Sequence, residues 1–147
     1  MLMQLIIGTA TMIATVLTSA IFAYVAMECI FRTSPWIVRR PHNLRFLFVM
    51  VGVLIGTIAA ITACVWVWAA TFYWLEALPD LETSLYFAFA SFTTLGFGDV
   101  LLPIEFRLLS GMAATNGLLL FGIYTAFLVE IMRRVREAQR RGVPDRD

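Results

Sequence analysis

The chain has 147 residues, of which 61% are hydrophobic and only 14% charged, and its mean hydropathy is +0.84. This apolar share is far above that of a soluble globular domain, so we expect one domain whose solvent is a bilayer. The net charge is +1, and all eleven basic residues are arginines that lie mainly in two short flanks. This distribution argues against a nucleic-acid partner.

The first apolar run extends from Leu5 to Met27, 23 residues without a charge. About 20 such residues are enough to cross a membrane as a helix. A cleaved signal peptide is the alternative, but no basic residue precedes the run, and a signal core has only about 7–15 apolar residues. We therefore expect an N-terminal transmembrane helix over residues 1–31.

Two further long runs predict an outer helix over 46–75 and an inner helix over 108–132. The outer helix is longer than the ~20 residues that a bilayer requires, so it should tilt or project beyond the membrane. Its last turns are expected to form an aromatic belt at one interface, made of Trp66, Trp68, Phe72, Tyr73 and Trp74. Between these helices, residues 81–92 make only ~18 Å of helix, which enters the bilayer without crossing it.

The arginines predict the orientation. Residues 32–45 form a basic loop with Arg32, Arg39, Arg40 and Arg45 and no acid, and the tail 133–147 holds six more arginines. An excess of arginine marks cytoplasmic segments, so the N-terminus should lie outside and the C-terminus in the cytoplasm. The predicted fold is thus an all-α integral membrane protein with three transmembrane helices and one re-entrant hairpin.

The segment "SFTTLGFGDV", Ser91 to Val100, combines flexible backbone with a charge inside this apolar chain. Irregular backbone survives at membrane depth only when it is buried in protein or lines an aqueous path. Gly96 and Gly98 reach φ values closed to other residues, and their alternation with larger residues can point successive carbonyls toward one axis. Aligned carbonyls replace the hydration shell of a monovalent cation.

The stretch "TTLGFGD" resembles the potassium-channel filter, usually written TVGYG followed by Asp, and its context of outer helix, pore helix, filter and inner helix is similar over roughly residues 45–133. The resemblance implies a tetrameric pore with K⁺ bound at the carbonyls of Thr94, Leu95, Gly96 and Phe97. The Thr94 hydroxyl would form the innermost site and Gly98 the outer lip. Thr93 would anchor the end of the pore helix (81–92), and Asp99 would lie at the outer mouth of the filter (93–99).

This sequence departs from the usual pattern at several positions. Leu95 replaces Val or Ile, and Phe97 replaces a Tyr whose hydroxyl usually ties the filter to aromatic residues of the pore helix. Those aromatic positions are expected at Tyr86 and Phe87, so Tyr86 is a candidate for the missing polar contact. Ala90 stands where many relatives have a Glu, so a carboxyl clamp with Asp99 is not available.

The inner helix also resembles the family at Gly117, Phe121, Gly122 and Thr125. Its glycines fit a hinge and close helix packing equally well, because glycine needs a reason inside a helix. Helical spacing places Leu118, Thr125 and Val129 toward the axis. Asn116 is expected either to brace the pore helix at Ser91 or to line a solvated cavity.

One filter strand cannot surround an ion, so we expect a homotetramer. The first helix has no arginine ladder, so voltage sensing is not expected, and anionic lipid at Arg32, Arg39, Arg40 and Arg45 is a candidate regulator. The predicted function is a potassium-selective channel of a plasma membrane, with a bacterial inner membrane favoured by the compact layout. The alternatives are a weakly selective cation channel and a non-conducting scaffold or accessory subunit. The sequence predicts no enzyme and no organic cofactor.

Overall fold

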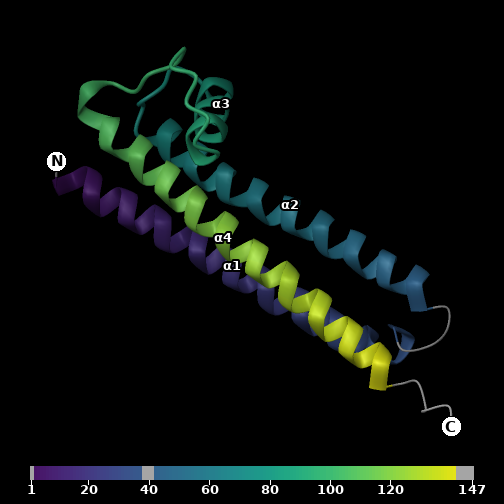
Figure 1. The fold of residues 1–147 in the computed structure, drawn as a ribbon. Coiled ribbons are helices and arrows are strands. Elements are labelled where there is room, and N and C mark those ends of the chain that lie inside the picture. Colours follow the sequence, from purple (N-terminus) through teal and green to yellow (C-terminus); the bar gives the residue numbers. More distant parts are fainter. Residues whose placement is uncertain (1, 38–41, 142–147) are drawn as a thin grey trace, which may run out of the picture.

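The computed structural model describes residues 2–37 and 42–141 and is helical throughout, with no strand in these ranges. Its elements are α1 (Leu2–Ile37), α2 (His42–Trp74), α3 (Leu81–Phe92), the short 3₁₀ helix η1 (Ile104–Phe106) and α4 (Arg107–Arg141). The three long helices run side by side, and α3 lies at the end where the N-terminus is found (Figure 1). α4 ends at the opposite end of the bundle (Figure 1).

Three helices are long and apolar enough to cross a membrane. The spans are Leu2–Ile30, Phe46–Trp74 and Ile104–Glu137. α3 has 12 residues and is too short to cross. The all-α membrane architecture predicted from the sequence is therefore confirmed, and the chain is a membrane protein.

The helix ends differ from the predicted boundaries in one region. The expected basic loop over 32–45 is wrong for most of its length, because α1 continues to Ile37 and α2 already begins at His42. α4 runs to Arg141, as expected from the spacing of Glu130 with Arg133 and Arg134, which predicts that the inner helix continues briefly into the tail. Arg39 and Arg40 lie outside the described residues, whereas α3 covers the same residues as the predicted short helix.

Local hydrogen bonds define the sharp turn between α2 and α3. The amide of Glu76 donates to Tyr73 O and that of Ala77 to Phe72 O, with Glu76 at a φ of 52°, which is the pattern of a Schellman helix end. Asp80 then caps α3, because its Oδ1 accepts from the amide of Thr83 at 2.8 Å. The hydrogen bonds that the Asp80 carboxylate accepts from the amide and the hydroxyl of Thr83 hold the pKa of this carboxyl below its ordinary value.

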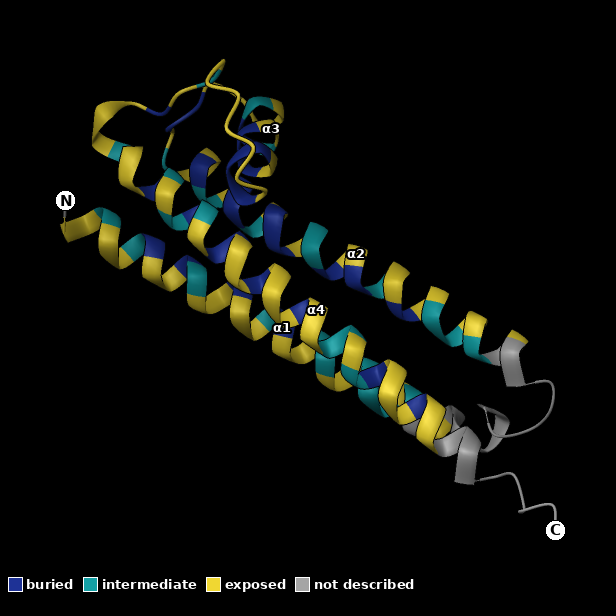
Figure 2. Cartoon of the chain, viewed as in Figure 1, coloured by how far each residue is buried: buried dark blue, intermediate teal, exposed yellow. Residues whose placement is uncertain are grey.

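The bundle has a large core at one end and a small one at the other. The large core lies beside α3, and we call this half the filter end; its bulkiest fully buried side chains are Trp68, Phe72, Phe92, Leu109 and Leu120. The small core consists of Val53, Ile131 and Val135, and we call this half the arginine end. Exposed residues cover most of the outward surface of the long helices (Figure 2).

The predicted aromatic belt is only partly correct. Trp66, Tyr73 and Trp74 are exposed, as a belt requires. Trp68 and Phe72 are fully buried, with ring centroids 5.7 Å apart, and belong to the large core.

Candidate functional site

Residues 93–99, which we call the filter segment, follow α3 directly and have an alternating backbone. Thr94, Gly96 and Gly98 have φ values of 59°, 52° and 80°, whereas Leu95 and Phe97 do not have positive φ. A threonine at positive φ is strained and persists only where its surroundings impose it. Positive φ at every second residue gives this segment a backbone that an ordinary β-strand does not have.

The amide groups of this segment point back to α3. Thr94 N donates to Ser91 O at 2.9 Å, and Leu95 N and Gly96 N both donate to Ala90 O, at 2.9 and 3.1 Å. The last carbonyls of a helix lack partners within the helix, so these bonds satisfy both groups. The amides of Thr94, Leu95 and Gly96 are thereby held on the α3 side.

Thr93 terminates α3, as predicted for the anchor at this position. Its amide and its hydroxyl both donate to Phe89 O, at 3.0 and 2.7 Å. All residues of the filter segment are exposed in the single chain, and Leu95 and Phe97 are 58% and 67% exposed. The side of the strand away from α3 is therefore uncovered within one chain (Figure 2).

Tyr86 supplies the polar contact that Phe97 cannot make. Its hydroxyl donates to Asp99 Oδ2 at 2.6 Å and ties the end of the filter segment to α3. This hydrogen bond holds the pKa of the Asp99 carboxyl below its ordinary value. Phe87, the second aromatic position, instead packs edge-on against Phe72 of α2, with ring centroids 5.2 Å apart.

A small cavity of about 110 Å³ lies behind the filter segment. It is bordered by Tyr86 and Ala90 of α3, by Gly96 to Asp99 of the segment and the following Val100, and by Ser110 of α4. Ala90 is too short to reach across this space, so Tyr86 and Asp99 make the side-chain link from α3 to the segment at this point.

A family model described as "Ion channel" matches residues 60–134, which is just over half of the chain. The match includes the second part of α2 from residue 60 onward, all of α3 and the filter segment, and most of α4, and it leaves α1 outside. The chain belongs to the ion channel family. No curated protein and no solved structure matches the chain.

Gly117 brings α4 into close contact with the end of α3. A Cβ on Gly117 would overlap the carbonyl oxygen of Phe92, so the close approach excludes any other residue. The Phe92 ring also packs edge-on against Phe121, with centroids 6.0 Å apart. The sequence left open whether Gly117 and Gly122 serve as a hinge or allow close helix packing, and at Gly117 the helices pack closely. At Gly122, by contrast, a Cβ would meet nothing within 4 Å.

The predicted role of Asn116 is wrong. Asn116 is fully buried within the chain, and its Oδ1 accepts from Thr15 Oγ1 at 2.7 Å and from Trp68 Nε1 at 2.9 Å. Ser91, its expected partner, lies instead 3.3 Å from the hydroxyl of Ser110. Asn116 thus joins α4 to α1 and α2 because Gly117, its neighbour, already occupies the side facing α3.

The sequence analysis missed a polar stripe on α1 that we call the docking stripe: Thr11, Thr15 and Ser19. All three are buried. The hydroxyls of Thr11 and Thr71 are 3.3 Å apart, and Tyr124 donates to Ser19 Oγ at 2.8 Å. Their spacing of four residues places them on one helix face, a signal that the sequence does contain.

The side chains predicted to face the pore axis lie on the exposed surface of α4. Leu118 and Val129 are 67% and 56% exposed, and Thr125 is exposed with its hydroxyl bonded to Phe121 O. At the arginine end, Arg32 pairs with Glu28 at 2.8 Å, and Arg133 and Arg134 pair with Glu130.

Proposed function

We propose that four copies of the chain assemble around a central axis and conduct K⁺ passively between their filter segments. The carbonyls of Thr94, Leu95, Gly96 and Phe97 would replace the water around the ion, with Gly98 at the outer lip. The alternating φ values of residues 94–98 carry this proposal, because they free a row of carbonyls while the amides bond to α3.

The need for four copies follows from the geometry of one strand. A single filter segment presents oxygens from one direction only, and a bare cation must be surrounded. Closed rotational symmetry supplies the missing directions with identical strands. The exposure of Leu95 and Phe97 in one chain supports the proposal, since neighbouring copies would cover these side chains.

A channel with weak selectivity among monovalent cations is the second candidate. The cavity of about 110 Å³ behind the segment favours it, because a strand with space behind it adapts more easily to ions of different size. The Tyr86–Asp99 hydrogen bond opposes such movement at one end of the segment. The balance between these two features decides how selective the channel is.

The proposed orientation places the N-terminus outside and the arginine end in the cytoplasm, in a plasma membrane that we take to be bacterial. Support comes from the sequence, in which ten of the eleven arginines lie in residues 32–45 and 133–147. Segments rich in arginine usually face the cytoplasm. The residues 2–30 that cross the membrane contain Glu28 as their only charge, so the proposed channel has no charge ladder for sensing voltage.

Reconstitution of the purified full chain into lipid vesicles tests this function. We expect currents that barium blocks and a reversal potential that follows the K⁺ gradient when Na⁺ opposes it. Gly96→Ala places a Cβ at a φ of 52° and should abolish conduction, whereas Gly111→Ala, where a Cβ meets nothing within 4 Å, should not. A reversal potential near zero would favour the weakly selective channel, and a folded tetramer without current would favour the scaffold.

A further inference from the structure

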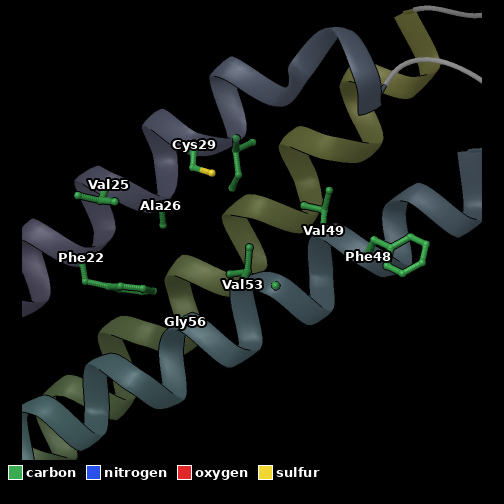
Figure 3. Close-up of a pocket in the computed structure, with 10 residues that line it drawn as sticks. Phe22, Val25, Ala26, Cys29, Phe48, Val49, Val53 and Gly56 are labelled. Carbon is green, nitrogen blue, oxygen red and sulfur yellow. The ribbon is translucent and has the colours of Figure 1, made fainter.

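An apolar groove of about 430 Å³ lies between α1 and α2 in the half of the bundle toward the arginine end. Figure 3 shows Phe22, Val25 and Cys29 of α1 on one wall, and Phe48 and Gly56 of α2 on the other. Its volume is within the range of about 300–1,000 Å³ that is usual for small-molecule sites. The groove is therefore large enough for a ligand.

The groove exists because contact between α1 and α2 becomes looser toward the arginine end. At Gly56 a Cβ would lie 2.9 Å from the Phe22 ring, so the two helices are in close contact there. One turn further, at Gly52, a Cβ would meet nothing within 4 Å. The small residues that allow close packing at Gly56 thus leave open space at Gly52.

The surroundings of the groove are lipid. Both walls lie within the spans Leu2–Ile30 and Phe46–Trp74, so the groove opens at membrane depth. Unfilled space beside packed side chains loses dispersion contacts, and an apolar site of this kind does not hold water well. An acyl chain is the occupant that the bilayer supplies there.

The positive charge of arginines near these helix ends favours a lipid with an anionic headgroup. Arg32, which is exposed and pairs with Glu28 at 2.8 Å, follows the membrane span of α1, and the sequence of residues 31–45 contains four arginines and no acid. Across the bundle, the guanidinium of Arg136 lies 5.4 Å from the centre of the Phe46 ring, at the start of the α2 span. A cluster of arginines beside a membrane attracts anionic headgroups.

We propose that this groove binds one acyl chain of an anionic glycerophospholipid from the leaflet at the arginine end. The headgroup would lie beside the arginines and the chain between Val25 and Gly52, where it completes the contact of α1 with α2. The inference goes beyond ion conduction and depends only on the membrane-spanning fold, so it stands or falls independently of ion selectivity.

Native mass spectrometry of the full-length protein tests the proposal. The protein is stripped of lipid in detergent and then titrated with dioleoyl phosphatidylglycerol or dioleoyl phosphatidylcholine. We expect about one phosphatidylglycerol retained per chain and at least tenfold weaker retention of phosphatidylcholine. Gly52→Leu fills the open space and should weaken retention of phosphatidylglycerol about tenfold, whereas Ala20→Leu, on an exposed part of α1, should not.

A second variant and a second measurement keep the test decisive. Val25→Phe fills the groove from the opposite wall and replaces Gly52→Leu if that variant does not fold. Phosphatidylglycerol with a photoreactive group in its acyl chain should label peptides that contain residues 22–30 and 48–56. Equal retention by the filled variants, equal retention of the two lipids, or cross-links between two protein chains in the groove would each overturn the proposal.

Discussion

The two halves of the α1 interface are built in different ways. At the filter end, Thr11, Thr15 and Ser19 bond to residues of α2 and α4, and Gly8 lies against Met112 so closely that a Cβ there would overlap its sulfur. At the arginine end, the same helix borders an apolar groove. Hydrogen bonds thus fix α1 at the filter end, whereas toward the arginine end its contacts include the Phe22 ring against Phe127 and a long contact of 4.0 Å from Arg134 Nη1 to Met27 Sδ.

This difference indicates that the positions of the helices are specified more tightly at the filter end than at the arginine end. Hydrogen bonds between membrane helices contribute about 1–2 kcal/mol or less each, but they specify register because an unpaired polar group in hydrocarbon is costly. The filter segment depends on α3, and α3 packs on α2 and α4, so α1 reinforces the elements that hold the filter. The arginine end has no comparable requirement.

The largest effect is expected from Gly117→Ala, at the contact that fixes the filter end. The new Cβ would overlap the Phe92 carbonyl oxygen, which is main chain and cannot rotate away, so α4 must move from α3. We expect a loss of about 3 kcal/mol or more, above the usual cost of overpacking. Thermal dissociation of the purified oligomer measures this loss. Gly111→Ala is the matched control, and equal stability of the two variants would show that the contact is not tight.

A smaller effect is expected from Thr15→Val, which keeps the shape and removes the hydroxyl. Asn116 Oδ1 then retains only Trp68 as a donor, and we expect a loss of about 1 kcal/mol. Thr18→Val is the control, because the Thr18 hydroxyl bonds only to Ala14 of its own helix. Thermal unfolding of both variants gives the comparison; equal losses would contradict the role of the docking stripe.

Tyr86→Phe should raise the pH at which acid weakens the filter segment, and it should also lower stability at neutral pH, where the hydrogen bond to the Asp99 carboxylate is fully formed. Tyr86 lowers the pKa of Asp99, so the Asp99 carboxylate contributes its stabilisation above the unfolded pKa of about 3.9 and loses it as pH falls through the lower folded pKa. Without the hydroxyl, the pKa of Asp99 rises and acid inhibition of the current should begin at a higher pH. Currents recorded across a series of acidic pH values on the filter side test this, and an unchanged midpoint would contradict it.

The smallest effect is expected from Val25→Ala in the groove. Val25 is 57% exposed and borders open space, so truncation removes few contacts and should cost less than about 0.5 kcal/mol in lipid-free detergent. Added phosphatidylglycerol should then stabilise the wild type more than this variant. A loss as large as that of Thr15→Val would remove the distinction between the two halves.

The fold was predictable from the sequence because the membrane imposes strong rules. The three apolar runs and the short helix 81–92 follow from length and hydropathy, and the structure confirms them. The end of α1 was not predictable, because Arg32 and Pro35 suggest a loop although α1 continues to Ile37. Proline and charge mark probable, not certain, helix ends.

The candidate site was predictable in its backbone and less so in its side chains. Alternating glycines indicate unusual φ values, and the structure adds Thr94, which carries no such signal. A polar contact from Tyr86 could be predicted, because Phe97 stands where the family usually has a Tyr, and the structure shows this contact as the Tyr86–Asp99 hydrogen bond. The partners of Asn116 were not, because Thr15 and Trp68 are distant in sequence and a single helix pattern cannot show which neighbour a polar residue meets.

The contact of Gly117 with the Phe92 carbonyl has a mechanical consequence. At this contact α4 cannot move closer to α3, because the Gly117 backbone already touches the Phe92 carbonyl oxygen. A bend of α4 that preserves the filter must therefore occur beyond Gly117, where Gly122 has free space around it.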